Sequence, residues 1–285
     1  MSLLVFGRTG QVASEIARRA PDALCLGRAQ ADLADPDSCA AAIARHAPRA
    51  VINAAAYTAV DRAEEEEPLA TRINAEAPAA MARACATLGI PLVHISTDYV
   101  FDGSGDAPRT AQAPTAPLNA YGRSKLEGEI GIHDTGVAHV ILRTSWVFSA
   151  HGTNFLKTML RLSDMRPALA IVNDQIGGPT PAGAIAHACL TIADRLCTDP
   201  ALTGTYHFSG APDVSWQGFA EAILAAAGRD VPVTGIPTAD YPTPAMRPLN
   251  SRLDCRTTEA AFGITRTDWR AALPDILREI REIQT

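Results

Sequence analysis

The chain has 285 residues, of which 47% are hydrophobic, and a formal net charge of -6. A chain of this length can bury a substantial core, either in one large domain or in a large domain with a smaller one. The negative net charge argues against nucleic acid or an anionic membrane as the main partner. No basic segment precedes an apolar one at the start, and no apolar run approaches the ~20 residues that span a bilayer. We therefore expect a cytoplasmic enzyme.

The cysteines and one acidic run have ordinary explanations. No C-x-x-C pair or His-rich segment accompanies the six cysteines, so we expect buried thiols in a reducing compartment. The run from Glu64 to Glu67 stands just before Pro68 and is typical of a solvated helix start.

In the first half of the chain, short apolar runs alternate with helical patterns. The predicted strands cover residues 3–7, 23–27, 50–56, 91–97 and 139–148. The predicted helices follow Gly10, cover 36–46 with Asp35 as N-cap, and cover 73–89 with Gly89 as the C-terminal stop. This alternation predicts an α/β fold with a Rossmann-like doubly wound parallel sheet, whose ligands bind at the carboxyl ends of the strands.

Beyond about residue 150 the pattern is less regular. Helices are predicted over 154–162, 181–196 and 215–228, a strand over 168–174, and an ordered Pro-rich loop over 236–248. We therefore expect a nucleotide-binding domain over residues 1–150, to which later segments return. A smaller, discontinuous α/β substrate-binding domain over 151–285 would close over the carboxyl edge of the sheet.

The first predicted strand ends in a glycine turn, in which Gly7, Gly10 and Ala13 form a G-x-x-G-x-x-A pattern. Glycines let a strand turn sharply into a helix whose N-terminal N–H groups face a diphosphate, and a small third residue lets helix and strand pack closely. Tight turns also use glycine without any ligand. The position in the first strand-helix unit nevertheless favours a dinucleotide site.

The end of the second strand normally decides between NADH and NADPH, because an acid there binds the ribose diol of NAD. Here the strand ends Leu26-Gly27-Arg28, without an acid. An arginine there would pair with the 2'-phosphate of NADPH. This slightly favours NADPH over NADH as the cofactor. The alternative is that Arg28 is a solvated loop residue.

Tyr121 and Lys125 are four residues apart in a segment of helical composition, so they share one face of a predicted helix. A tyrosine with a pKa near ~10 is a poor acid-base catalyst at neutral pH, and a neighbouring ammonium favours its phenolate. We therefore expect Lys125 to lower the pKa of Tyr121. The alternative is an exposed ion pair of Lys125 with Glu129. The strand that ends Ser96-Thr97 brings polar side chains to the same sheet edge and favours a catalytic site.

Together these motifs resemble the extended short-chain dehydrogenase/reductase superfamily. Within it, five blocks resemble the dTDP-4-dehydrorhamnose reductase family: STDYVFDG (96–103), YGRSKLEGE (121–129), RTSWVF (143–148), NDQIGGPT (173–180) and YPTPAMRPLNSRLD (241–254). The resemblance implies an NAD(P)H-dependent oxidoreductase of dTDP-rhamnose biosynthesis. It would reduce the C4 keto group of dTDP-4-dehydro-6-deoxy-L-mannose to give dTDP-L-rhamnose.

The resemblance also implies roles for individual residues. Tyr121 would donate a proton to the C4 alkoxide, Lys125 would hold the nicotinamide ribose, and Thr97 would hold the carbonyl oxygen. The implied cofactor-binding residues, with Arg28 added from its position, are Gly7, Arg8, Thr9, Gly10, Gln11, Val12, Arg28, Asp32, Leu33, Ala56, Tyr57, Thr58, Tyr121 and Lys125.

The implied substrate-binding residues are Val60, Thr97, Asp98, Tyr99 and Trp146. The ring of Trp146 would pack on the apolar face of the sugar, although a core tryptophan is the ordinary alternative. Arg247 is a further candidate because a guanidinium suits a diphosphate. Its alternative is a salt bridge that ties down its loop.

One departure from the family pattern concerns magnesium. Some members dimerise around a magnesium ion that glutamates of both subunits hold. Glu15 matches one such position, but the segment PTPAGAIAHA (179–188) has no acid where another is expected. We therefore expect no bound metal and a monomer or a weak homodimer.

Two other functions stay open. Another nucleotide-sugar reductase or a 4-epimerase of the superfamily would share the glycine turn and the Tyr-x-x-x-Lys pair, and an epimerase would retain NAD through purification. A non-catalytic NADP-binding regulatory subunit, such as the methionine adenosyltransferase beta subunit, also resembles this family. The combination of Thr97, Tyr121 and Lys125 with the five blocks favours a reductase.

Overall fold

The computed structural model describes residues 2–284 and centres on a six-stranded parallel sheet. The strand order is β2-β1-β3-β4-β5-β10. The strands are β1 (Leu3–Phe6), β2 (Leu24–Leu26), β3 (Ala50–Asn53), β4 (Leu92–Thr97), β5 (His139–Thr144) and β10 (Gly204–His207). Because β1 lies between β2 and β3, the order reverses there, and the crevice for a ligand opens at the carboxyl ends of β1 and β3. The predicted doubly wound sheet is confirmed.

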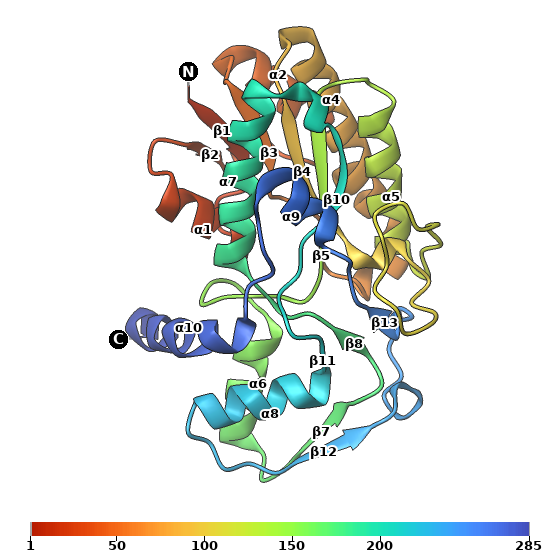
Figure 1. The fold of residues 1–285 in the computed structure, drawn as a ribbon, viewed down its shortest axis with the longest axis vertical. Coiled ribbons are helices and arrows are strands. Elements are labelled where there is room, and N and C mark those ends of the chain that lie inside the picture. Colours follow the sequence, from red (N-terminus) through yellow and green to blue (C-terminus); the bar gives the residue numbers. More distant parts are fainter. Residues whose placement is uncertain (1, 285) are drawn as a thin grey trace.

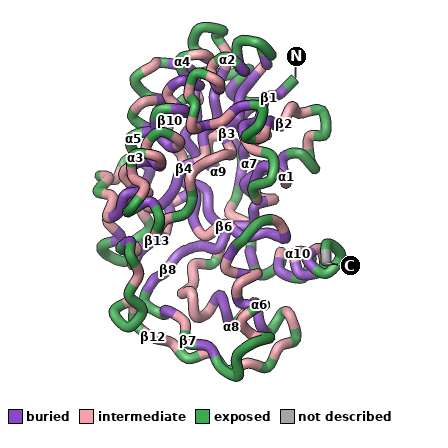
Figure 2. The backbone as a smooth tube through the Cα atoms, turned by 180° about the vertical axis from the view of Figure 1, so that it is seen from behind, coloured by how far each residue is buried: buried purple, intermediate pink, exposed green. Residues whose placement is uncertain are grey.

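Helices cover both faces of this sheet (Figure 1). One face carries α1 (Gln11–Arg19), α7 (Ala182–Thr198) and α9 (Arg256–Phe262), and the other carries α2 (Pro36–His46), α4 (Ala77–Leu88) and α5 (Ala120–His133). In Figure 2 the buried residues follow the strands through the middle of this region. The strands are therefore apolar on both faces, as a sheet covered on both sides requires.

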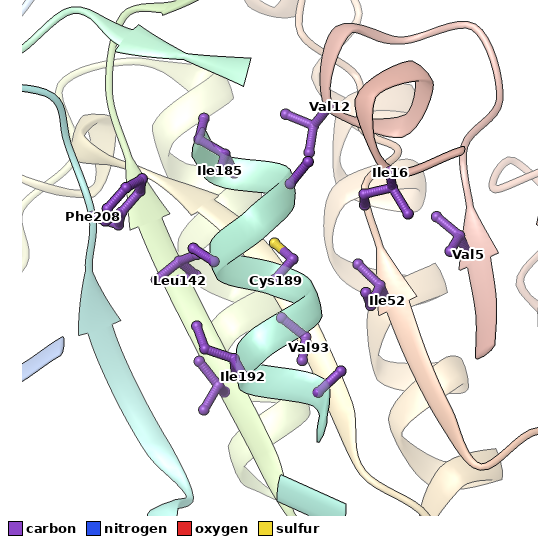
Figure 3. Packing of buried hydrophobic residues seen from close by; sticks show 14 of the residues in the cluster. Val5, Val12, Ile16, Ile52, Val93, Leu142, Ile185, Cys189, Ile192 and Phe208 are labelled. Atoms are coloured by element: carbon purple, nitrogen blue, oxygen red, sulfur yellow. The ribbon is translucent and has the colours of Figure 1, made fainter. Parts of the chain in front are cut away.

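The two faces are separated by the alternation of side chains along each strand. Leu3 and Val5 of β1 contact the cluster around α7, whereas Leu4 and Phe6 contact the cluster around α2 and α4. Figure 3 shows α7 from close by, with Cys189 and Ile192 lying over the sheet residues. A segment from the second half of the chain thus completes the core of the first sheet.

The ends of several helices follow the predicted signals. Asp35 caps α2, with its carboxylate accepting the Ser38 N–H, and Gly89 ends α4 at a φ of 65°. The helix predicted from residue 73 begins instead with α3 (Glu67–Thr71) and a wide π turn over Arg72–Glu76. That turn carries Asn74, whose amide bonds the Tyr57 backbone and the Ser124 hydroxyl and so joins the loop after β3 to α5.

Two predicted strands are too long. β3 ends at Asn53 rather than at residue 56, and β5 ends at Thr144 rather than at residue 148. Trp146 interrupts the second because its φ is 49°, which an extended strand does not contain. The next two residues form β6 (Val147–Phe148), which pairs with β9 (Thr180–Pro181).

A second core lies beneath the sheet in Figure 1. Its elements are α6 (Phe155–Met165), β7 (Leu169–Val172), α8 (Trp216–Ala226), β12 (Val233–Ile236) and α10 (Trp269–Gln284), and β7 pairs with β12. A small sheet of β11 (Val214–Ser215), β8 (Ile176–Gly177) and β13 (Asn250–Ser251) lies between the large sheet and α8, β7 and β12 in Figure 1. Between these segments α7, β10 and α9 return to the large sheet. The domain division at residue 150 stays a prediction.

Two expectations about composition need correction. Cys39, Cys85, Cys189 and Cys255 are buried free thiols as expected, but Cys197 is exposed. The glutamate run is not merely solvated, because Glu64 accepts the Ala120 N–H, Glu66 accepts the Tyr57 hydroxyl, and Glu67 pairs with Arg123. These contacts fasten the run to α5 and to the loop after β3. Between residues 2 and 284, no helix has both the length and the apolar character needed to cross a membrane.

Candidate active site

A cleft of about 990 Å³ runs along the carboxyl ends of the central strands. Most of the predicted site residues line it: Gly7, Arg8, Thr9, Gly10, Gln11, Val12, Arg28, Asp32, Leu33, Ala56, Thr58, Val60, Thr97, Asp98, Tyr99, Tyr121, Lys125 and Trp146. Tyr57 and Arg247 do not line it. The fold therefore brings residues from positions 7 to 146 of the chain to one opening.

The glycine turn after β1 fits a diphosphate. Gly7 has a φ of 118°, and a Cβ there would lie 3.0 Å from that of Ala13 and 3.3 Å from the Ala54 backbone, so a side chain would be both strained and crowded. Gly10 is the N-cap of α1 and offers no side chain to its first N–H groups. Those N–H groups lie at the cleft and are free for an anion. The turn thus fits a dinucleotide cofactor.

At the end of the cleft beyond β2, a positively charged arginine and a negatively charged aspartate lie side by side. Arg28 is exposed, and its Nε lies 3.0 Å from Asp32 Oδ2. The Ala34 N–H and then Arg28 hold the pKa of Asp32 below its usual range. The acid that β2 itself lacks is therefore supplied by Asp32, six residues after the end of the strand. A carboxylate for a ribose diol and a guanidinium for a 2'-phosphate stand side by side, so this end fits either nicotinamide cofactor.

Tyr121 enters the cleft because α5 starts close beneath the end of β4. Asn119 caps the helix by accepting the Gly122 N–H at 2.8 Å, and its own amide donates to Met246 O at 2.8 Å. A Cβ at Gly122 would collide with the carbonyl of Tyr99, so only glycine allows this approach. The Tyr121 ring then meets that of Tyr99 edge to face, with 5.5 Å between centroids.

Tyr121, Thr97 and Asp98 form a row at the cleft, in which Thr97 and Asp98 are buried and Tyr121 is half-buried. The Thr97 hydroxyl donates to Asp98 Oδ1 at 3.1 Å, and it also interacts with the Tyr121 phenol. Burial raises the pKa of Tyr121 to about 12, and the hydrogen bond to Thr97 offsets this only in part. Lys125 does not lower this pKa, contrary to the expectation, because burial dominates it. Tyr121 stands in its protonated form, which is the form that donates a proton.

Lys125 is buried, with 1% of its surface exposed, and burial lowers its pKa to about 8. Its Nζ lies 2.8 Å from Ile95 O and 3.0 Å from His94 Nε2. The alternative of an exposed pair with Glu129 is wrong, because Glu129 is also buried. Its carboxylate pairs with Arg143 at 2.6 Å and accepts the Ser96 hydroxyl.

Asp98 is expected to make the free energy of unfolding depend on pH. Burial raises its pKa from 3.8 to about 6, so between these values the native state binds the proton more tightly than the unfolded chain. The free energy of unfolding therefore falls as pH rises through this window. Asp98→Asn, which cannot ionise, is expected to be more stable than the wild type above pH 6, by at most about 3 kcal/mol.

Urea unfolding of Asp98→Asn and wild type at pH 4 and pH 8 measures this difference. The exposed loop residue Asp106 supplies the matched control, and Asp106→Asn is expected to change the free energy of unfolding little at either pH. A stability advantage of Asp98→Asn that is the same at pH 4 and pH 8 would contradict the buried-carboxyl explanation.

Trp146 forms one wall of the cleft in a constrained position. Its ring stacks on that of Trp216, with centroids 3.5 Å apart and planes 9° from parallel. Gly177 also lies against this ring, since a Cβ there would lie 2.8 Å from Trp146 Cε2. Trp216 is held in turn by a hydrogen bond to Gln175. The wall is therefore rigid, and the positive φ of Trp146 is the conformation that presents the ring to the cleft.

Arg247 and Tyr57 are engaged elsewhere. Arg247 pairs with Asp61 at 2.9 Å, and Asp61 also accepts the Ala245 N–H, so the arginine ties the Pro-rich loop to the segment after β3. This is the salt-bridge alternative rather than a free clamp. The Tyr57 hydroxyl donates to Glu66 at 2.6 Å.

Glu15 lies beside His151 and Glu279, whose ligand atoms all come within 4.8 Å of one another. Both Arg18 and Arg19 pair with the same Glu15 oxygen, and Arg19 reaches into the space beside Gly183. Magnesium prefers oxygen ligands in octahedral geometry and competes poorly with two guanidinium groups. These residues therefore do not fit a magnesium ion.

Several residues at or behind the cleft carry no sequence signal. Thr144 lines the cleft at the end of β5, and its buried hydroxyl has no hydrogen-bond partner within residues 2–284. His94 sits in the middle of β4 behind Lys125. Thr144 reaches the cleft because it pairs with Thr97 across β4 and β5. The pairing of these two strands is the signal that could have identified it.

The comparisons with known proteins agree with this geometry. The family described as RmlD substrate binding domain matches residues 1–282. A dTDP-4-dehydrorhamnose reductase from Sinorhizobium fredii is 45% identical over 278 residues, covering 94% of each chain. A solved dTDP-4-dehydrorhamnose reductase from Clostridium acetobutylicum superposes with a TM-score of 0.91 at 33% identity, covering all of both chains. Another from Bacillus anthracis, in complex with NADP, gives 0.89 at 31% identity, covering 98% of this chain and 100% of that one. The chain therefore belongs to the dTDP-4-dehydrorhamnose reductase family of Rossmann-fold oxidoreductases.

Proposed function

We propose that this protein reduces the C4 keto group of dTDP-4-dehydro-6-deoxy-L-mannose with NADPH or NADH and so produces dTDP-L-rhamnose. The main support for this proposal is the convergence of the catalytic residues on one cleft. Thr97, Tyr121 and Lys125 converge on one cleft that also holds a diphosphate-fitting glycine turn, in a chain of this reductase family. A binding module would have no need of a buried proton donor there.

The reaction needs a proton at the oxygen that becomes an alkoxide. The glycine turn and Lys125 would hold a reduced nicotinamide cofactor, which would supply the hydride for C4. Tyr121 donates its phenolic proton to the developing alkoxide, and its high pKa keeps that proton available at neutral pH. The Thr97 hydroxyl would turn its single proton from Asp98 to the same oxygen when the sugar binds, and would so orient the carbonyl. Lys125 lies four residues along the same helix and holds the ribose of the cofactor.

The sugar would lie between the proton donors and the tryptophan wall. Trp146 offers an apolar face for the sugar ring and its methyl group. Val60, Asp98 and Tyr99 line the same part of the cleft and complete the substrate pocket. Arg247 would act indirectly, by holding the Pro-rich loop through Asp61.

Arg28 is expected to set the preference for NADPH. Arg28→Ala removes the guanidinium that faces the ribose end, and Asp32 then remains alone for a diol. We expect NADPH affinity to fall by about tenfold, which corresponds to one charge-assisted contact, with NADH affinity unchanged or improved. Titration of both cofactors, followed by the fluorescence of the reduced nicotinamide, measures this. Equal losses for the two cofactors would contradict the assignment.

The function is tested by following absorbance of the reduced nicotinamide with the purified protein and the keto sugar. Consumption of NADPH or NADH that depends on the sugar supports the proposal, and no consumption of either overturns it. An epimerase would instead retain NAD after purification and consume no reduced cofactor. A regulatory subunit would bind NADPH without turning over the sugar.

We further propose that the protein is a monomer or a weak homodimer, because the residues around Glu15 do not fit the ion that joins some relatives. Sedimentation with and without added Mg²⁺ tests this, and a tight dimer that dissociates on chelation would contradict it.

A further inference from the structure

A buried imidazole lies directly behind Lys125. His94, in the middle of β4, is 0% exposed, and its Nε2 lies 3.0 Å from Lys125 Nζ. Its Nδ1 lies 3.1 Å from the amide nitrogen of Asn53, the last residue of β3. Asn53 and His94 are paired neighbours in the sheet. The three side chains thus form one continuous row, of which only Lys125 lines the cleft.

One backbone group decides where the protons of this row lie. The Ala55 N–H donates to Asn53 Oδ1 at 3.2 Å, so the amide turns its NH₂ group toward His94. An NH₂ group only donates, and His94 Nδ1 must therefore accept and carry no proton. Burial holds the pKa of His94 well below its usual range, so the ring is neutral. Its single proton then lies on Nε2 and points at Lys125.

This orientation matters because an ammonium has three donors and no acceptor. A charged Lys125 would set one donor against another at the 3.0 Å contact. The neutral amine has a lone pair that accepts the His94 proton, while one of its N–H groups donates to Ile95 O. We propose that His94 positions Lys125 and stabilises its neutral amine in the cofactor-free protein by donating the Nε2 proton to it.

The charged groups around Lys125 are compatible with control of its protonation by His94. On α5 the groups near Lys125 are Tyr121 and Glu129, and Glu129 is already paired with Arg143 of β5. His139 of β5 lies beyond His94. Burial lowers the pKa of Lys125 to about 8, and Glu129 offsets this in part. Lys125 is therefore a group that gains or loses a proton near neutral pH rather than a fixed cation, and His94 is a positioning residue that acts through it.

The direct test needs no catalytic activity. The protein is labelled with ¹⁵N-histidine, and the ring nitrogens of His94 are observed by NMR between pH 6 and pH 9, with assignment through contacts to neighbouring side chains. We expect a neutral ring with its proton on Nε2 throughout this range. A ring protonated on Nδ1, or on both nitrogens, overturns the inference.

The kinetic test rests on the proposed function. When the ammonium of Lys125 is required beside Tyr121, kcat/KM falls as pH rises through the pKa of Lys125. His94→Gln places a carboxamide oxygen where Nε2 stood, and this acceptor favours the ammonium. We expect the basic limb of the pH profile to move up by about one pH unit or more.

The matched control is His207→Gln. His207 is an equally buried imidazole, on β10, whose Nδ1–H donates to Arg109 O rather than to a site residue. The basic limb of the pH profile of His207→Gln is expected at the same pH as in the wild type. An unshifted limb in folded, active His94→Gln overturns the inference, and the NMR experiment on wild type decides should that variant fail to fold. A wild type that shows the Nε2 proton but does not reduce the keto sugar overturns the proposed function alone.

Discussion

Replacing Tyr121 with phenylalanine is expected to lower kcat by about two to four orders of magnitude, with cofactor affinity unchanged within a few-fold. The phenol and the Thr97 hydroxyl both line the cleft, and the Thr97 hydroxyl already donates to Asp98, so the phenol is the group free to give its proton to a substrate carbonyl. Phenylalanine keeps the ring and its edge-to-face contact with Tyr99 and removes the hydroxyl group that carries the proton. Steady-state rates measure kcat, and nicotinamide fluorescence measures cofactor binding.

The control for this substitution is Tyr206→Phe on β10. The Tyr206 hydroxyl donates to Leu202 O, away from the cleft, so the same change there should leave kcat as it is in the wild type. Retention of more than about a tenth of the wild-type kcat by Tyr121→Phe would contradict the role of Tyr121 as general acid.

Replacing Arg143 with methionine is expected to lower the free energy of unfolding by about 3–5 kcal/mol. Arg143 and Glu129 are 6% and 3% exposed and form a two-pronged ion pair, with the second contact at 2.9 Å. Methionine fills much of the space but leaves the Glu129 carboxylate buried, with the Ser96 hydroxyl as its remaining partner. An uncompensated buried charge is the costly outcome, whereas the intact pair contributes little by itself.

Urea unfolding of three variants separates these effects. The double variant Glu129→Gln with Arg143→Met removes the unpaired charge and should recover part of the lost free energy. Arg256→Met breaks an ion pair whose arginine is 85% exposed, and should cost less than about 1 kcal/mol. Equal losses in Arg143→Met and Arg256→Met would show that burial of the pair has no energetic consequence.

The architecture was predictable because its signals are local. The alternation of apolar runs with helices, the cap at Asp35 and the stop at Gly89 each depend on a few neighbouring residues, and the structure follows them. The glycine turn is of the same kind, since Gly7 must adopt a positive φ against Ala13, three residues beyond Gly10. Parallel pairing then brings the strand ends together without further information.

The features that local sequence patterns do not predict depend on contacts between residues that are distant in sequence. Trp146 adopts a positive φ because Gly177 and Trp216 hold its ring, and neither is close in sequence. The pairing of Arg247 with Asp61 spans 186 residues, and no spacing rule selects that partner.

His94 and Glu129 illustrate the same limit within the site. His94 stands in an apolar strand pattern, and only the neighbouring positions of Asn53 and Lys125 give it a role. Glu129 has the spacing of a helical partner for Lys125, but burial against β5 gives it Arg143 instead. A short-range rule identifies candidates for contact, and packing selects among them.

The most direct test of the proposed reaction is the fate of the hydride. The wild type is incubated with the dTDP-4-keto sugar and, in separate samples, with NADPH or NADH that carries deuterium at both C4 positions of the nicotinamide, and the product is examined by NMR and mass spectrometry. We predict dTDP-L-rhamnose with one deuterium at C4 of the sugar. A product without deuterium at C4, or a 4-keto sugar recovered unchanged with neither cofactor consumed, would contradict it.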